Sequence, residues 1–302
     1  MISINSNNEW DTLKEVILGT ADHMNWPSTK DFRSKFKSAP IGKVPNTIIY
    51  QVNNALENFK NVLEREGVKV IRPKEINYRE RNGFGCYSPR DSILIIGDKV
   101  ICSPMHLKDR MMEQEALLPH LTGRSYITFP DIEADYMFDA ANVMRCNNDI
   151  LYLVSSTGNF AGARWLQNVL GHEYRVTTIP KTVYHGSHID STIIPLREGL
   201  VMLNGARVKE ENIPEFMKNW DKLWILDEDI VEQETVVPSI CTKWMALNVF
   251  SINPELVVCD PDQYTIREKL NQVGIETIGV KLPHGRYLLG GHHCTTLDTI
   301  RE

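Results

Sequence analysis

The sequence predicts an α/β protein built from five copies of one unit, in which two strands, a helix and a third strand follow one another. Three observations support this fold class: paired apolar segments joined by short turns recur along the chain, helical segments alternate with these pairs, and the spacing is regular. A period of roughly 20–50 residues is typical of repeat and propeller architectures. Ordinary α/β alternation produces a similar pattern, so both interpretations stay open at this point.

The strand pairs are indicated by apolar runs on both sides of a short turn. Four pairs are clear, and a fifth at Tyr287–Thr299 is weaker. The clear pairs are Ser92–Pro104, Val143–Ser155, Ser191–Asn204 and Ala246–Asp260. Their turns, GDK, NND, REG and NPE, contain the Gly, Asn or Pro that turns favour.

Helices are predicted where apolar residues recur with a period of 3.6. The predicted helices are Thr47–Glu66, Asn159–Leu170 and Asp262–Val273, with a shorter and weaker one at Ile213–Trp220. An apolar strand follows each of them, with the sequences VKVIRP, YRVTTIP, IETIGV and LWILD, respectively. One unit alone cannot bury its apolar face, but several units arranged around an axis can.

Length and charge restrict the class of protein. The 302 residues allow two domains or one large repeated domain, and we interpret residues 1–302 as a single catalytic domain. The net charge of −6 argues against nucleic acid or an anionic membrane as a partner. No apolar stretch approaches the roughly 18 residues that span a bilayer. The first residues lack the basic and apolar regions of a signal peptide, which predicts a cytoplasmic protein.

The cysteines do not suggest a zinc or redox motif, because no two of them have CxxC spacing. In a reducing compartment a cysteine is most often a buried apolar residue, so any functional cysteine has to be identified from its surroundings. The six cysteines are Cys86, Cys102, Cys146, Cys241, Cys259 and Cys294.

Polar residues occupy a similar position at each strand pair, and this recurrence predicts a shared site. Successive positions are 48, 49, 54 and 52 residues apart. Equivalent positions in units around an axis converge on that axis, so we expect these side chains to meet in one central site. They are Asp91, Asp139, His188 with Asp190, Thr242 with Lys243, and Cys294.

This combination of side chains favours nucleophilic catalysis on a cationic substrate. A histidine can take up and return protons while a thiolate attacks, which fits His188 and Cys294. Carboxylates nearby raise the pKa of a thiol unless a cation binds between them. A guanidinium is a planar cation whose N–H groups match carboxylates in pairs. The acidic surroundings therefore suit an arginine-like substrate better than an acyl donor, which needs an oxyanion hole.

Metal binding is the alternative for the adjacent His292 and His293 in the string GGHHC. Adjacent side chains on a strand point to opposite faces, so two such histidines rarely share a metal. Three ligands with tetrahedral spacing are not evident. We expect neither a metal nor an organic cofactor, and we attribute the paired glycines to a close approach of the backbone beside the thiol.

Six strings resemble the amidinotransferase family of the guanidine-modifying (pentein) superfamily. This family includes glycine amidinotransferase and the amidinotransferases of streptomycin, cylindrospermopsin and saxitoxin biosynthesis. The strings run in the family's order and cover essentially the whole chain. They are NEWDTLKEVILG at 8–19, PRDSILIIGDKVICSPM at 89–105, FDAANVMRCNNDILY at 138–152, HIDSTI at 188–193, KWMALNVF at 243–250 and GGHHCTTLDTIR at 290–301.

The resemblance implies a fold and three catalytic roles. The implied fold is a pentein α/β-propeller with five ββαβ units around a pseudo-fivefold axis. Cys294 matches the family's nucleophile, His188 its general acid/base, and Asp139 the carboxylate that orients the histidine. The implied reaction moves the amidino group of arginine through an amidino-cysteine to a primary amine, with release of ornithine and without a cofactor.

The resemblance also implies how arginine is held. Asp91 and Asp190 match the two aspartates that bind the guanidinium, and Arg207 falls where the family binds the substrate carboxylate. Cys241 and Thr242 stand where relatives carry a pair of serines near that carboxylate. A threonine hydroxyl can still donate there, whereas a cysteine thiol is a poor donor. The family resemblance further suggests a homodimer.

Two departures from the glycine-using members concern the acceptor. Those members carry a bulky methionine next to the catalytic histidine, whereas this chain has the smaller Ser187, with His185 nearby. The segment between Glu115 and Asp139 is also shorter, so a covering loop is expected to be missing. We therefore expect an acceptor larger than glycine.

Two other functions remain open from the sequence. Water instead of an amine could resolve the amidino-cysteine, which would make the chain a guanidine hydrolase such as an arginine deiminase. The chain could also be a catalytically silent protein that binds arginine or another guanidinium compound. Formation of citrulline or urea without an added amine distinguishes the hydrolase, and a thiol at Cys294 of ordinary reactivity would favour the silent protein.

Overall fold

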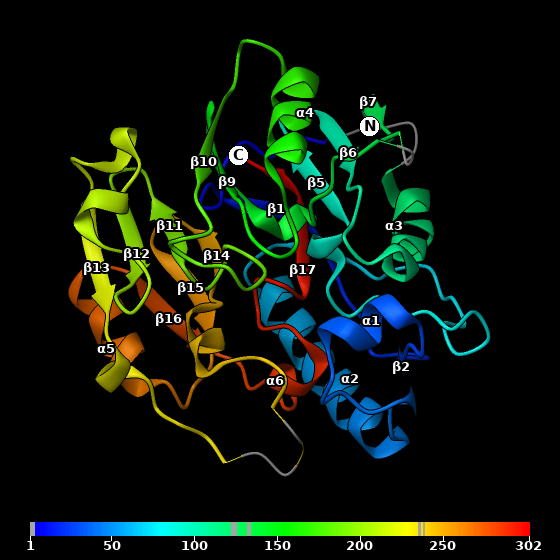
Figure 1. Cartoon of the computed structure of the whole chain (residues 1–302). Helices are drawn as coiled ribbons and strands as arrows, with labels where there is room; N and C mark the ends of the chain where they lie inside the picture. The colour runs from blue at the N-terminus through cyan, green and yellow to red at the C-terminus, as the bar shows by residue number, and fades with distance from the viewer. Residues whose placement is uncertain (1–3, 122–125, 132–133, 235–236, 238) are drawn as a thin grey trace.

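The structure, a computed structural model, describes residues 4–121, 126–131, 134–234, 237 and 239–302. Within these residues the chain forms five three-stranded sheets and one two-stranded sheet (Figure 1). In each three-stranded sheet the middle strand pairs antiparallel with one neighbour and parallel with the other. A strand–strand–helix–strand unit produces this pattern, because a hairpin gives the antiparallel pair and a crossover gives the parallel one.

Four of the sheets contain strands that are consecutive in the sequence, and their hairpins confirm the four clear strand pairs of the sequence analysis. A third strand was predicted for three of these sheets, and in each of them the observed strand overlaps the predicted string. The sheets consist of β5 (Ile93–Ile96), β6 (Lys99–Cys102) and β7 (Tyr126–Thr128); β8 (Val143–Cys146), β9 (Asp149–Leu153) and β10 (Arg175–Ile179); β11 (Ile193–Arg197), β12 (Leu200–Asn204) and β13 (Asp221–Ile225); and β14 (Phe250–Asn253), β15 (Leu256–Cys259) and β16 (Glu276–Gly279).

The fifth sheet joins the two ends of the chain, and the hairpin predicted within Tyr287–Thr299 is wrong. Strand β17 (Thr296–Arg301) pairs with β1 (Leu13–Leu18), and β4 (Lys69–Ile71) completes the sheet (Figure 1). The segment before β17 forms the short helix α6 (Gly285–Leu288), which ends where Leu289 adopts a φ of 68°. This left-handed residue and the two glycines after it turn the chain, so no first strand forms there.

Three predicted helices are present, and the fourth is not. The sequence predictions correspond to α2 (Asn46–Arg65), α4 (Phe160–Leu170) and α5 (Tyr264–Gln272); α3 (Gln114–Leu121) lies between β6 and β7. Between β12 and β13 the chain forms only short 3-10 turns, one of them at Glu215–Met217. Pro214 precedes this turn and β13 begins directly after Trp220, which leaves no room for a regular α-helix. None of the helices in the described ranges is long and apolar enough to cross a membrane.

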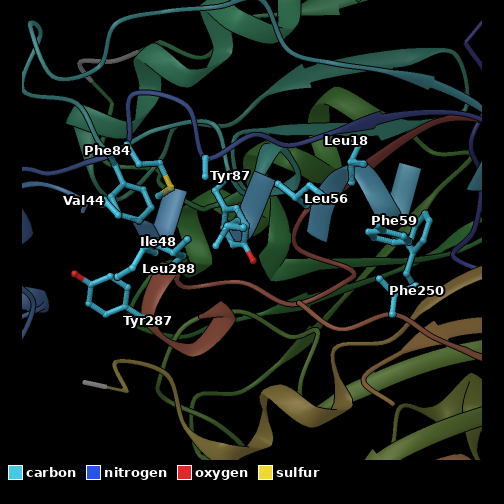
Figure 2. Packing of buried hydrophobic residues seen from close by; sticks show 14 of the residues in the cluster. Leu18, Val44, Ile48, Leu56, Phe59, Phe84, Tyr87, Phe250, Tyr287 and Leu288 are labelled. Carbon is cyan, nitrogen blue, oxygen red and sulfur yellow. The ribbon is translucent and has the colours of Figure 1, made fainter. Parts of the chain in front are cut away.

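Helix α2 packs under the segment that leads to Cys294. Its buried stripe consists of Ile48, Val52, Leu56, Phe59 and Leu63, spaced as one helical face requires. Figure 2 shows members of this stripe in one cluster with Phe250 and the α6 residues Tyr287 and Leu288. Each large apolar side chain buried in this way contributes about 1.5–3 kcal/mol, so the cluster fixes α6 and the turn after it.

A short strap crosses the other side of the site. It runs from β2 (Asn25–Trp26) through α1 (Lys30–Lys35) to β3 (Gly42–Lys43), and β2 pairs with β3. Thr29 caps α1 by accepting a hydrogen bond from the Phe32 amide, and the Phe32 ring packs between Trp26 and Phe84. The strap is thereby anchored by a buried aromatic cluster, which places the end of α1 over the cavity described next.

Candidate active site

The predicted polar residues stand at recurring places, each ahead of one strand of a three-stranded sheet. Six of them line one cavity of about 130 Å³, and the prediction that they converge is confirmed for these six: Asp91 before β5, Asp139 before β8, His188 and Asp190 before β11, Thr242 before β14 and Cys294 before β17. Lys243 lies elsewhere, because its ammonium forms ion pairs with Asp227 and Glu232.

Cys294 is held in a tight turn and is only 2% exposed. Its amide donates to Asn248 Oδ1 at 3.1 Å, and its thiol donates to Asp190 Oδ2, also at 3.1 Å. A Cβ at Gly291 would lie 2.7 Å from Asn248 Oδ1, and one at Gly290 would lie 3.0 Å from the Cys294 Cβ. Any side chain at these two positions would therefore clash, which confirms that the paired glycines allow a close backbone approach.

The surroundings of Cys294 favour the neutral thiol. Burial raises the pKa of Cys294 well above its ordinary value, and the charges of Asp190 and Asp91 raise it further. No hydrogen bond joins Cys294 to His188 within the described part of the chain, although both side chains line the cavity. The thiol and the imidazole are thus placed to act on a substrate between them rather than on each other.

His188 is bound by two carboxylates. Its Nε2 lies 3.0 Å from Asp139 Oδ2, and its Nδ1 lies 3.6 Å from Asp91 Oδ1. Asp139 is itself fixed, since its Oδ1 accepts a hydrogen bond from the His106 amide at 3.1 Å. Burial opposes the charged imidazolium, but Asp91 and the hydrogen bond to Asp139 prevail and raise the pKa of His188 above its ordinary value.

Asp91 offers one carboxylate oxygen to the cavity. Its Oδ2 accepts a hydrogen bond from Arg110 Nη1 at 2.9 Å, whereas its Oδ1 is buried without a hydrogen-bond partner. Arg110 is also held by Glu113, which accepts from Nε and Nη2 at 2.8 and 2.9 Å. Burial raises the pKa of Asp91 despite His188 and Arg110. A buried carboxylate oxygen without a donor has lost water without replacement, so a cationic donor entering the cavity is favoured there.

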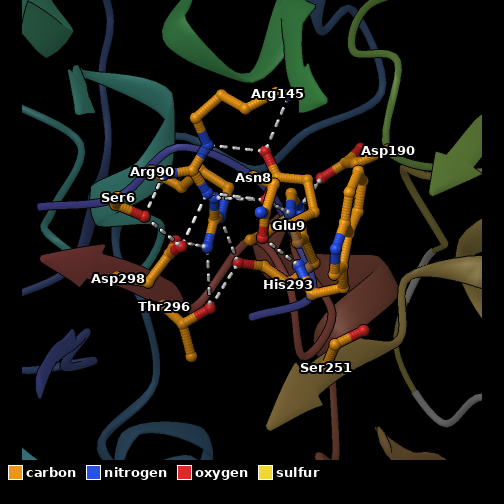
Figure 3. A network of polar contacts seen from close by, with 12 residues as sticks. Ser6, Asn8, Glu9, Arg90, Arg145, Asp190, Ser251, His293, Thr296 and Asp298 are labelled. Carbon is orange, nitrogen blue, oxygen red and sulfur yellow. Dashed lines mark hydrogen bonds and ion pairs between the residues drawn. The ribbon is translucent and has the colours of Figure 1, made fainter. Parts of the chain in front are cut away.

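Asp190 is oriented from behind by His293. The His293 Nδ1 lies 3.1 Å from Asp190 Oδ2 and its Nε2 lies 3.3 Å from Glu9 Oε2 (Figure 3). Burial opposes the charge on Asp190, but the hydrogen bond and charge of His293 hold the pKa of Asp190 well below its usual range. Asp190 is therefore an anion next to the thiol. Among the described residues no group of three or more His, Cys, Asp or Glu side chains is arranged to hold a metal.

Arg207 lies behind the edge of the cavity, against three residues that line it. Its Nη1 donates to Ser191 Oγ at 2.9 Å, its Nη2 lies 3.4 Å from Thr242 Oγ1, and its guanidinium stacks 3.6 Å from the centre of the Tyr184 ring. The described residues place no carboxylate within ion-pair distance of Arg207, and burial lowers its pKa. An anion next to Thr242 would satisfy this cation.

Three further predicted residues differ in their placement. Cys241 and Ser187 line the cavity. His185 is not among its described lining residues; its carbonyl accepts a hydrogen bond from the Ser156 amide at 3.1 Å. The shortened segment between Glu115 and Asp139 lies partly outside the described residues.

Site residues that were not predicted from the sequence include Lys35, Arg110 and Tyr184, which line the cavity, and Asn248, which holds the Cys294 amide. His293 was considered only as a metal ligand. Asn248 lies six residues after Thr242 in the string KWMALNVF, directly before β14, so the recurring position before a strand was a usable signal. Nothing local marks Lys35, because its place depends on how the strap packs.

The arrangement combines a buried thiol, a histidine and three carboxylates around one small cavity. The carboxylates match the N–H groups of a planar cation, and the thiol lies next to one of them. Such a site can attack the central carbon of a bound guanidinium and supply a proton to the leaving nitrogen.

The comparisons with known proteins agree with this chemistry. No protein-family model matches the chain. The chain is 34% identical to inosamine-phosphate amidinotransferase 1 of Streptomyces griseus, over 100% of this chain and 98% of that protein. The solved structure of the inosamine-phosphate amidinotransferase of Streptomyces griseus matches with a TM-score of 0.90 at 32% identity, covering 99% of this chain and 97% of that one.

A second amidinotransferase structure and a hydrolase extend the comparison. An amidinotransferase of the saxitoxin pathway from Microseira wollei matches with a TM-score of 0.88 at 29% identity, over 99% of this chain and 97% of that one. A dimethylarginine dimethylaminohydrolase matches with a TM-score of 0.70 at 16% identity, over 95% of this chain and 99% of that one, and shows the shared pentein fold alone. With a relative of 34% identity along its whole length, the chain belongs to the amidinotransferase family and is an enzyme that transfers amidino groups.

Proposed function

We propose that the chain is an L-arginine-dependent amidinotransferase that carries the amidino group on Cys294 and passes it to a primary amine larger than glycine. One observation carries the proposal. The Cys294 thiol lies 3.1 Å from the Asp190 carboxylate, in a cavity where Asp91 presents a buried oxygen without a hydrogen-bond partner. These groups bracket a position that suits a guanidinium carbon.

Arginine would bind with its guanidinium between Asp91 and Asp190 and its carboxylate toward Arg207 and Thr242. The guanidinium brings a positive charge beside the thiol, which offsets the two carboxylates that raise the pKa of Cys294 in the free enzyme. Substrate binding therefore promotes loss of the thiol proton to solvent. The free enzyme keeps an unreactive thiol, and the thiolate forms where its substrate is bound.

In the first half-reaction the Cys294 sulfur forms a bond to the guanidinium carbon. His188, whose raised pKa keeps it protonated, gives its proton to the departing nitrogen as the carbon–nitrogen bond breaks. Ornithine leaves as the amine, and Cys294 carries a cationic amidino group. Asp139 orients the imidazole through the contact at Nε2 and stabilises its charge.

In the second half-reaction the acceptor amine attacks the amidino carbon and loses a proton to the now neutral His188. The carbon–sulfur bond breaks, the electron pair returns to Cys294 as thiolate, and the product leaves as a substituted guanidinium. The two half-reactions balance without an oxidant, a metal or a cofactor, and they predict ping-pong kinetics.

The acceptor is expected to be larger than glycine because Ser187 lines the cavity next to His188. The alignment with the Streptomyces griseus relative spans 344 positions, more than the 302 residues of this chain, so that relative carries residues that this chain lacks. Its name specifies an inosamine phosphate, which is also larger than glycine. Glycine as the best acceptor in a side-by-side panel of amines would contradict this part of the proposal.

We also infer that the whole chain is one catalytic domain whose five sheets are arranged around a pseudo-fivefold axis, and that it forms a homodimer. Support for the axis comes from the cavity residues, which are supplied by segments ahead of one strand in each of the five three-stranded sheets. Support for one domain comes from β17 and β1, which join the two ends in one sheet. The homodimer is carried over from the family resemblance alone.

The decisive experiment is to incubate the enzyme with arginine alone and measure its intact mass, followed by peptide mapping. The expected result is a gain of one amidino group on Cys294, which added amines discharge. Accumulation of citrulline or urea without an amine would instead show a hydrolase. Neither an adduct nor a product would contradict arginine as the donor.

Asp139→Asn is expected to lower the rate of ornithine release by about 10²–10⁴-fold, because the amide holds and stabilises the imidazolium poorly. Loss of the negative charge also lowers the pKa of His188 from its raised value. His188 then loses its proton at lower pH, so the high-pH decline of the arginine half-reaction should move to lower pH. Rapid-quench measurements across pH check both effects.

The matched control is Asp135→Asn, an exposed aspartate four residues upstream. It is expected to leave the rate and the pH profile within about twofold of the wild type, as surface substitutions usually do. Equal pH profiles for Asp139→Asn and the wild type would refute the role given to Asp139.

A further inference from the structure

The cavity contains a cation that neither half-reaction uses. Lys35 ends α1 and lines the cavity, and its ammonium lies 3.2 Å from Ser156 Oγ and 6.0 Å from the centre of the Phe36 ring. Within the described ranges no carboxylate lies within ion-pair distance of Lys35. An ammonium has three donors, so Lys35 keeps donors for a ligand.

The other cations of the site already have partners or a role. Arg110 is paired with the carboxylates of Asp91 and Glu113. Arg207 lies near Asp190 and Thr242, where the carboxylate of arginine is proposed to bind. One donor molecule supplies one carboxylate, so Lys35 is a second cation for which arginine has no anion.

Lys35 belongs to the His188 end of the cavity. Its contact Ser156 precedes Thr157, whose carbonyl accepts a hydrogen bond from the Asp139 amide, whereas Arg207 contacts Ser191 and Thr242. Lys35 is half-buried, and burial is the largest influence on its pKa, which it lowers. A half-buried ammonium forms its strongest hydrogen bonds with an anionic partner.

The strap holds Lys35 in place. Thr29 donates to Asp109 Oδ2 at 2.8 Å, and Arg33 Nη1 donates to the carbonyl of Pro40 at 3.1 Å. Ser156, the contact of Lys35, in turn donates to the carbonyl of Gly186, which adjoins Ser187. The ammonium is therefore linked to the part of the cavity where a small residue leaves room for the acceptor.

We propose that Lys35 selects acceptors that carry an anionic group, a carboxylate or a phosphate, in addition to the primary amine. This inference rests on the proposed function, since it assigns the acceptor class of the same site. The amine would lie at His188, which removes its proton, and the anion would reach the ammonium at the end of α1. Lys35 is thus a specificity-determining residue for the second half-reaction.

The test compares matched acceptors on enzyme whose Cys294 has first been loaded with arginine. The pairs are 4-aminobutyrate with 1-aminobutane, and 3-aminopropyl phosphate with 3-aminopropanol. The wild type is expected to favour the anionic member of at least one pair, and the preferred pair identifies carboxylate or phosphate. In Lys35→Gln, kcat/KM for that anionic amine should fall about 10–100-fold, mainly through KM, while the neutral amine changes less than about twofold.

Two variants make the result specific. Lys35→Arg keeps the charge and should retain most of the preference, and Lys37→Gln, which removes an exposed lysine of the same strap, should behave as the wild type. Equal turnover of both members of each pair by the wild type would overturn the proposal. So would an equal loss on charged and neutral amines in Lys35→Gln, which indicates a structural role. Failure of arginine to load Cys294 would instead refute the proposed function, and it is seen before any acceptor is added.

Discussion

Cys294→Ala is expected to abolish amidino loading and to lower the rate of ornithine release at least about 10³-fold. Covalent catalysis divides one difficult transfer into two easier steps, and alanine offers no atom that can carry the amidino group. The substitution removes the thiol's hydrogen bond to Asp190 but keeps both aspartates. The variant should therefore still bind arginine. Intact mass after incubation with arginine and a discontinuous assay for ornithine check the expected result.

The matched control is Cys259→Ala. Cys259 is also buried, and burial raises the pKa of its thiol to about 12, but it packs in the cluster between β15 and α5 and not against the cavity. It should load with arginine as the wild type does. An amidino adduct on any other cysteine of Cys294→Ala, or activity within a few-fold of the wild type, would exclude Cys294 as the carrier.

Arg145→Met is expected to lower the free energy of unfolding by about 3–5 kcal/mol. Arg145 is 1% exposed, and all its side-chain N–H groups have acceptors. Its Nε and Nη2 donate to Glu9 at 2.8 and 2.7 Å, and Nη2 also donates to Asp298 at 2.6 Å (Figure 3). Its Nη1 donates to Ser6 Oγ and to the Ile95 carbonyl. Methionine would remove the guanidinium that pairs with the buried carboxylates of Glu9 and Asp298, and would leave each of them with fewer donors. Equilibrium unfolding in urea measures the loss.

Arg175→Met provides the contrast, because it removes an arginine–carboxylate pair at the surface. The Arg175 side chain is 67% exposed beside Asp149, and such pairs contribute about 0–1 kcal/mol. Similar losses for the two variants would mean that burial of the Arg145 network has little energetic consequence. A large loss of stability for the Arg145 variant alone would show that the buried network is important for folding. Glu9, which this network holds in place, also contacts His293.

The sequence predicted the repeated part of the fold because the information was local. Turn residues between apolar runs defined the hairpins, and the 3.6-residue period defined α2, α4 and α5 within a few residues. The sheet of β17, β1 and β4 was missed because β17 pairs with a strand whose residues lie about 284 positions away, which no local pattern reveals. The helix predicted at Ile213–Trp220 failed because its apolar spacing is matched equally by short turns that bury Ile213 and Met217.

The candidate site was predictable to the extent that its residues share a position relative to a strand. That regularity located Asp91, Asp139, His188, Asp190 and Cys294 before any geometry was known. Lys35 belongs to the strap, and Arg110 belongs to a 3-10 turn between β6 and α3. Only packing brings these two side chains to the cavity. The contact of His293 with Asp190 could not be predicted either, because a histidine next to a cysteine in the sequence is compatible with many other roles.

The pairing of β17 with β1 has a consequence for how the enzyme is made. A ribosome synthesises β17 after all the other strands described here, so β1 must wait for its antiparallel partner while the segments between them emerge. Cys294 lies just before β17, and its turn packs on α2, which was made long before. The cavity is therefore completed only after β17 has emerged, and a nascent chain that stops short of Cys294 lacks both this cysteine and the strand that pairs with β1.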